Sequence, residues 1–171
     1  MDGAGPDVAG ITFDTGNVLA RGEDPVAAAR RVAPYVHSTH IKDTILFFNE
    51  SGLVHQPRPC GEGILDWEAI LSILGKYSPD LNLTLEDHKR LMPIEIYSSE
   101  WIATHPDLTV VELASLVHLA RLSEDKIHKG IILDTESYEI IPWEDQMFTR
   151  MDISLNYLQG IIRSKNFSNN S

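Results

Sequence analysis

The sequence predicts an α/β fold in which strands and helices alternate along the chain. Short apolar runs rich in β-branched residues end at polar clusters, and segments with apolar residues at helical spacing follow them. Short connections between such units imply parallel strands, whose carboxyl ends gather at one face. Because polar clusters stand at three of these ends, we predict the functional site there.

The first unit consists of a strand over residues 8–13, a turn over residues 14–17 and a helix that begins at Pro25. Proline suits the first helical position because its missing N–H would have no partner there. Apolar residues then recur at helical spacing over residues 26–33. Asp14 is therefore predicted to lie at the carboxyl end of the first strand.

Two further units follow. The second has a strand over residues 36–41, a long loop containing prolines and glycines, and a helix over residues 67–74. The third strand is predicted over residues 81–85 and ends at Glu86. The sheet thus receives three parallel strands.

Residues 93–171 are predicted to form a helical C-terminal extension. One helix is capped by Asp107 or Thr109, and another begins at Pro142. The polar tail, residues 164–171, is predicted to be disordered.

The charge balance disfavours nucleic acid as a partner, because Lys and Arg total 14 while Asp and Glu total 25, a net charge of −11. The first ten residues lack a signal-peptide pattern, and no apolar run is long enough to span a membrane. A single cysteine, Cys60, cannot form an intrachain disulfide. We therefore expect a cytoplasmic protein.

Three side chains at the predicted strand ends form a candidate metal site: Asp14, His40 and Glu86. Two carboxylates and one imidazole, without a thiolate, suit a borderline or hard divalent cation such as Mn²⁺, Co²⁺, Mg²⁺ or Zn²⁺. From the pattern alone, the three side chains could equally cap helices or face solvent. We expect them to converge on one point if they bind an ion.

Four short motifs occur in the order seen in a known barrel family: Phe13-Asp14-Thr15-Gly16-Asn17, His40-Ile41-Lys42-Asp43, Gly61-Glu62-Gly63-Ile64-Leu65-Asp66-Trp67 and Leu83-Thr84-Leu85-Glu86. Over residues 8–90 the chain resembles sugar phosphate isomerases and epimerases of the xylose-isomerase-like TIM barrel superfamily. The resemblance implies that residues 1–92 are the last three βα units of a (β/α)8 barrel.

The resemblance also implies residue roles. The metal ligands would be Asp14, His40 and Glu86, and Glu86 would also be one of two catalytic acid/base groups. Asn17 falls where the family often has a polar substrate contact, and Lys42 follows the metal-binding histidine, where it could donate to a substrate oxygen. Arg58, in the predicted long loop, is a further candidate for binding substrate hydroxyls or phosphate.

The implied reaction is proton transfer next to the carbonyl of a sugar or sugar phosphate, through an enediolate. The family uses a further glutamate from an earlier strand, and a full barrel has eight strands. We therefore expect a truncated or split gene product, or a second chain that completes the barrel, and little isomerase activity from the 171 residues alone.

Two alternatives stay open at this point. Residues 11–19 also resemble the nucleophile strand of haloacid-dehalogenase-like phosphatases, in which Asp14 would be phosphorylated. The chain could also be a non-catalytic barrel remnant that retains a sugar-binding surface.

Overall fold

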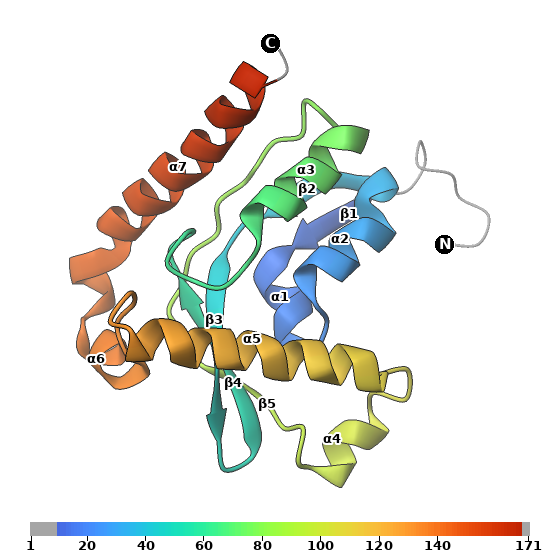
Figure 1. The fold of residues 1–171 in the computed structure, drawn as a ribbon, viewed down its shortest axis with the longest axis vertical. Coiled ribbons are helices and arrows are strands. Elements are labelled where there is room, and N and C mark those ends of the chain that lie inside the picture. The colour runs from blue at the N-terminus through green and yellow to red at the C-terminus, as the bar shows by residue number, and fades with distance from the viewer. Residues whose placement is uncertain (1–9, 169–171) are drawn as a thin grey trace.

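A short parallel sheet forms the first part of the structure. The computed structural model describes residues 10–168. Strand β1 (Ile11–Asp14) pairs in parallel with β2 (Val36–His40), and their register places Asp14 opposite His40 (Figure 1). The first two predicted strands are confirmed with slightly different ends, although residues 8 and 9 of the first lie outside the described part of the chain.

The third predicted strand is present only as a parallel bridge between Ile41 and Leu85. Ile41 donates its N–H to the carbonyl of Thr84 at 2.8 Å, and Glu86 donates to the carbonyl of Ile41 at 3.1 Å. Residues 81–86 therefore lie beside β2 in the predicted order, without forming a full strand. The described residues form an α/β structure of the expected kind but no closed barrel.

The predicted long loop after β2 is wrong, because most of it forms a β-hairpin. Strand β3 (Asp43–Asn49) pairs antiparallel with β4 (Gly52–Arg58), and β5 (Met92–Ile94) adds to the other side of β4. The prolines near the end of β4 obscured the β-forming runs before them. Gly52 closes the turn at φ 138°, a conformation that favours glycine.

The helices of the first half cover the parallel strands. The predicted turn at residues 14–17 is instead the start of helix α1 (Thr15–Ala20). Helices α2 (Pro25–Val32) and α3 (Trp67–Tyr77) agree with prediction, and a short 3₁₀ helix (Ala33–Tyr35) leads into β2. Each α-helix is capped by an aspartate that accepts backbone N–H groups: Asp14, Asp24 and Asp66.

Helices dominate the second half of the chain. They are α4 (Ser99–Ala103), α5 (Val110–His128), α6 (Thr135–Ile140) and α7 (Trp143–Ser168). Thr109, one of the two predicted caps, forms a capping box at the start of α5. The boundary predicted at residue 92 falls within β5.

The tail that we predicted to be disordered begins inside α7, which extends to Ser168, and residues 169–171 lie outside the described part. None of the helices in the described residues combines the length and apolar character needed to cross a bilayer.

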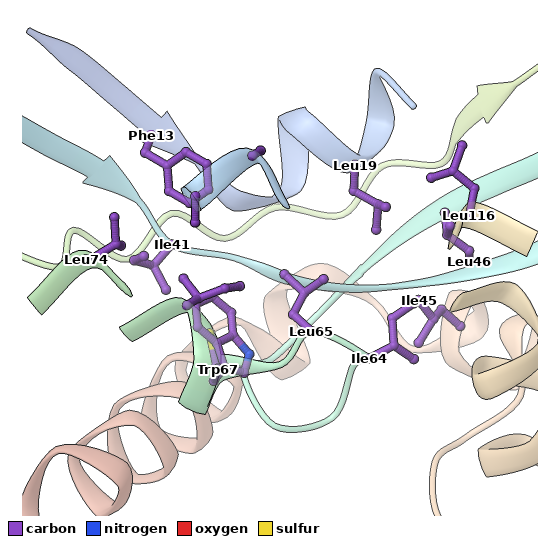
Figure 2. Close-up of a cluster of buried hydrophobic side chains, with 14 of the residues drawn as sticks. Phe13, Leu19, Ile41, Ile45, Leu46, Ile64, Leu65, Trp67, Leu74 and Leu116 are labelled. Carbon is purple, nitrogen blue, oxygen red and sulfur yellow. The ribbon is translucent and has the colours of Figure 1, made fainter. Parts of the chain in front are cut away.

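One hydrophobic core joins the parallel strands, the hairpin and the helices (Figure 2). At one end Phe13, Ile41 and Leu74 pack with Trp67, and at the other Leu46 of the hairpin meets α5. Helix α5 crosses the hairpin, and the hydroxyl of Ser123 accepts the N–H of Leu46 at 3.1 Å (Figure 1). The C-terminal helices are therefore part of the same packed unit as the parallel sheet.

Candidate metal centre

Asp14 is fixed at the end of β1 by the helix that follows it. Its Oδ1 accepts the backbone N–H groups of Gly16 at 3.1 Å and Asn17 at 2.8 Å. Its Oδ2 accepts the Asn17 side-chain amide at 2.7 Å. Asn17, predicted to contact substrate, thus also orients the Asp14 carboxylate.

The predicted ligands Asp14, His40 and Glu86 converge. Each offers one ligand atom, and these atoms lie within 4.8 Å of one another. His40 Nδ1 is 3.0 Å from Glu86 Oε2 and 3.7 Å from Asp14 Oδ2. The parallel alignment of β1, β2 and residues 81–86 produces this convergence. Their expected meeting is confirmed, and their role as ligands stays a prediction.

Lys42 reaches into the same cluster. Its Nζ lies 3.0 Å from Asp14 Oδ2 and 2.9 Å from Glu86 Oε2, and its side chain is only 2% exposed. The close contact with the Lys42 ammonium is the main reason that the pKa of Glu86 lies below its usual value. Glu86 is therefore an ionised carboxylate at neutral pH.

The path of Lys42 is set by the first turn of α1. The Thr15 hydroxyl donates to the Lys42 carbonyl at 2.7 Å and accepts the Lys42 N–H at 3.0 Å. Gly16 leaves the space for the aliphatic part of the side chain, since a Cβ there would lie 2.5 Å from Lys42 Cγ. The Asp-Thr-Gly-Asn motif thus positions both a carboxylate and a lysine that follows 28 residues after Asp14.

Two histidines lie near Lys42 that the sequence did not assign to the site. His55 is fully buried on β4, and neither of its ring nitrogens has a hydrogen-bond partner among the described residues. Burial, followed by the charges of His88 and Lys42, lowers the pKa of His55 to about 3. The pKa of His88 is lowered for the same main reason, its own partial burial. The apolar residues Leu53 and Val54, directly before His55, were the available signal for its burial.

Asp43 directly follows Lys42, but its carboxylate binds the segment over residues 61–67 and is not part of the metal cluster. Its carboxylate is buried and accepts Trp67 Nε1 at 2.8 Å and the N–H groups of Gly61 and Leu65 at 2.9 and 3.2 Å. It also accepts the N–H of Thr44 at 2.8 Å. Burial raises the pKa of Asp43 despite these bonds. The Gly-Glu-Gly motif therefore folds around an aspartate that directly follows Lys42.

The side chain of Arg58, predicted to bind substrate, contacts residues of β4 and of the region around α6. It lies at the end of β4, not in a loop, and is 2% exposed. Its guanidinium donates to Gln56 Oε1 at 2.6 Å and to the Leu133 carbonyl at 3.1 Å, and stacks 3.7 Å above the Tyr138 ring. Burial lowers its pKa to about 10. Its described contacts connect the hairpin to α6, so the structure offers no support for its predicted substrate role.

The donor set fits a divalent cation. One imidazole nitrogen and two carboxylate oxygens, already close together, are typical of sites for Mn²⁺, Co²⁺, Mg²⁺ or Zn²⁺. Asp14 Oδ2 and Glu86 Oε2 also contact Lys42, so an ion would share these oxygens with an ammonium group. Asp14, His40 and Glu86 are the described residues that could hold it.

Sequence similarity to known proteins covers part of the chain. The chain is 31% identical over 64 residues to the uncharacterized protein YihM of Escherichia coli (strain K12), a stretch that covers 37% of this chain and 20% of YihM. The match thus spans about a fifth of that relative's length. No solved structure matches the chain significantly.

A family model described as xylose isomerase-like TIM barrel matches residues 1–106. The match begins before β1 and ends beyond α4, so it includes Asp14, His40 and Glu86. This family match favours the barrel interpretation of residues 11–19 over their resemblance to the nucleophile strand of haloacid-dehalogenase-like phosphatases. The chain belongs to the xylose isomerase-like TIM barrel family.

Proposed function

We propose that this chain contributes the metal centre of a divalent-metal-dependent isomerase or epimerase acting on a sugar or sugar phosphate. The observation that carries the proposal is the convergence of Asp14, His40 and Glu86 in a chain of this family. Mn²⁺, Co²⁺, Mg²⁺ and Zn²⁺ all suit the donor atoms. When bound, the ion would polarise the carbonyl and hydroxyl oxygens of the substrate.

Glu86 is the acid/base group in this proposal. Its carboxylate removes the proton from the carbon next to the substrate carbonyl, the C–H electron pair forms the double bond of the enediolate, and the carbonyl oxygen becomes negative. The lowered pKa of Glu86 means that the carboxylate carries no proton at neutral pH, as this role requires. Its Oε2 lies at the centre of the cluster, within 3.0 Å of both His40 and Lys42.

Lys42 is the electrostatic partner of the reaction. Its ammonium group is held among the carboxylates with little exposure, where it can donate to a substrate oxygen that gains negative charge. Asn17 lies at the same edge, with its amide on Asp14 and its residue exposed to solvent, and is proposed to contact substrate hydroxyls.

The second acid/base group that returns the proton is proposed to come from a further strand. Within the described residues β1 pairs on one side only, with β2, so the sheet has an edge on which another parallel strand can add. We propose that the rest of the barrel, on the same polypeptide or on a partner chain, pairs there.

The first test is metal binding. Titration of Mn²⁺ followed by electron paramagnetic resonance should show one site in the protein, weakened at least about tenfold by Asp14→Asn or Glu86→Gln, because each removes a ligand. Glu50→Gln, on the exposed hairpin turn, is the matched control and should leave binding unchanged. Equal binding by all variants would overturn the metal centre.

The second test is turnover on a panel of ketoses and ketose phosphates with each metal, both for this chain and for the chain combined with any partner that copurifies. Turnover that Glu86→Gln reduces by about 10²–10⁴ supports the acid/base role. Metal and sugar binding without turnover in any combination would favour the non-catalytic barrel remnant instead.

A further inference from the structure

The residue after Glu86 is bound by the C-terminal helix α7. Arg150 Nε donates to Asp87 Oδ2 at 2.6 Å, and Arg150 Nη2 donates to Asp87 Oδ1, so the guanidinium and the carboxylate form a bidentate ion pair. The side chains are only 3% and 8% exposed. A buried bidentate pair of this kind fixes the orientation of the Asp87 carboxylate as well as its distance from Arg150.

Arg150 itself is held in place by its neighbours. Its guanidinium lies 5.3 Å from the centre of the Tyr138 ring and 5.4 Å from that of Trp143. The Gln146 amide oxygen accepts its Nη1 at 3.4 Å, and its own carbonyl accepts the Ser154 hydroxyl at 2.8 Å. The arginine is therefore a rigid attachment point and not a mobile surface side chain.

A second contact secures the same segment two residues further on. Lys89 Nζ donates to the carbonyls of Glu139 and Ile141, the latter at 2.8 Å, where α6 ends. A lysine at this position satisfies carbonyls that have no partner within the helix. Asp87 and Lys89 thus attach the segment after Glu86 to two C-terminal helices.

Glu86 needs such support. It lies at the end of the short segment beside β2, and its backbone is joined to the sheet by the hydrogen bond from its N–H to Ile41. Residues 86–91 have no regular secondary structure beyond the bridge at Leu85. The direction of the Glu86 side chain therefore depends on its contacts with His40 and Lys42 and on how its chain neighbours are held.

We propose that Arg150 is a positioning residue for the metal centre, acting through Asp87 to hold Glu86 toward Asp14 and His40. This inference rests on the proposed function and extends it, because Arg150 lies in a region beyond residues 1–106 that match the barrel family. It assigns the C-terminal helices a role in the site and not only in packing.

The test uses a charge-neutral double variant, Asp87→Asn with Arg150→Gln, which leaves no buried charge unpaired and retains hydrogen-bonding groups. Arg163→Gln, on the exposed face of the same helix, is the matched control. Two quantities are measured: the Mn²⁺ dissociation constant and the hydrogen exchange of backbone amides by NMR.

We expect the Mn²⁺ dissociation constant of the double variant to rise about 10–100-fold, the usual effect of losing support behind a metal ligand. Exchange at the Glu86 amide should accelerate at least about tenfold, while the Ile41 amide keeps its protection because its acceptor, the carbonyl of Thr84, precedes the segment that Arg150 holds. The Arg163 variant should change neither quantity.

Unchanged Mn²⁺ affinity and unchanged Glu86 exchange in the double variant would overturn the inference. Equal acceleration at Glu86 and Ile41 would also overturn it, since the ion pair would then only stabilise the fold. If the unmodified protein binds no Mn²⁺, the proposed function fails, but the exchange comparison still decides whether Arg150 positions Glu86.

Discussion

Replacing Gly16 by alanine tests how tightly Lys42 is built into the centre. A Cβ on Gly16 would lie 2.5 Å from Lys42 Cγ and 2.6 Å from Cδ, far inside van der Waals contact. The Lys42 side chain cannot easily move away from this Cβ, because both of its ends are held. Its backbone is bonded to the Thr15 hydroxyl at 2.7 and 3.0 Å, and its ammonium lies between two carboxylates.

The expected magnitude follows from two opposing effects. In a helix, glycine to alanine stabilises by up to about 1 kcal/mol. Overpacking a buried site costs about 1–3 kcal/mol. For Gly16→Ala we therefore expect the free energy of unfolding to change from roughly zero to a loss of about 2 kcal/mol.

Two glycines provide matched controls. Gly75 in α3 and Gly160 in α7 are helical, and a Cβ on either would meet nothing within 4 Å. Alanine at these positions should raise the free energy of unfolding by about 0.5–1 kcal/mol. The difference from Gly16→Ala isolates the contact with Lys42.

Urea denaturation of the three variants measures these free energies, and Mn²⁺ titration reports on the carboxylates that Lys42 contacts. We expect Gly16→Ala to alter Mn²⁺ affinity and the two controls to leave it unchanged. If Gly16→Ala stabilises the protein as much as the controls do, Lys42 is not confined as the structure indicates and the reasoning fails.

Three further predictions concern side chains around the centre. His55, with its pKa of about 3, stays neutral in the folded protein but binds a proton below about pH 6.5 in the unfolded chain. The free energy of unfolding should therefore fall by about 2 kcal/mol as the pH is lowered from 7 to 5. His55→Leu should flatten this dependence in urea denaturation at each pH, and equal slopes would contradict the assignment. Asp43→Asn should cost about 2–4 kcal/mol, because each carboxylate oxygen accepts two N–H groups and an amide nitrogen in place of either oxygen would face two of the four donors. The change should also shift the Trp67 indole N–H resonance, and an unmoved resonance would argue against the buried contact. Thr15→Val removes both hydrogen bonds to the Lys42 backbone at nearly constant side-chain volume, so the free energy of unfolding measured with denaturant should fall by about 1–3 kcal/mol. A change below about 0.5 kcal/mol would show that these bonds contribute little to stability.

The sequence was informative about the parallel strands because local signals mark them. An apolar β-branched run places β1, the strand-like residues 36–41 place β2, and the pair Asp24-Pro25 marks the start of α2. Parallel alignment then requires residues at successive strand ends to meet, and Asp14, His40 and Glu86 do so. Family membership could be inferred from the same short motifs.

Local signals failed where two structures compete for one composition. Residues 43–58 contain β-forming runs together with prolines, and the prolines favour a loop in the sequence although the segment forms a hairpin. The same signal placed Arg58 in that loop, although it is buried on β4. Likewise, residues 14–17 suit both a turn and a capped helix, and packing of Leu19 in the core favours the helix.

Other features depend on contacts that no local pattern encodes. The sequence by itself indicated the first two parallel strands, helices α2 and α3, the Thr109 cap and the residues that end the parallel strands, because these follow from the preferences of adjacent residues. Only the tertiary structure placed the Lys42 ammonium between Asp14 and Glu86 and bound Asp87 to Arg150, 63 positions away. Such partners are chosen by the packing of α7 against α3 and of the hairpin against α1, since a charged side chain can be buried only where the whole fold brings a counter-charge within hydrogen-bonding distance.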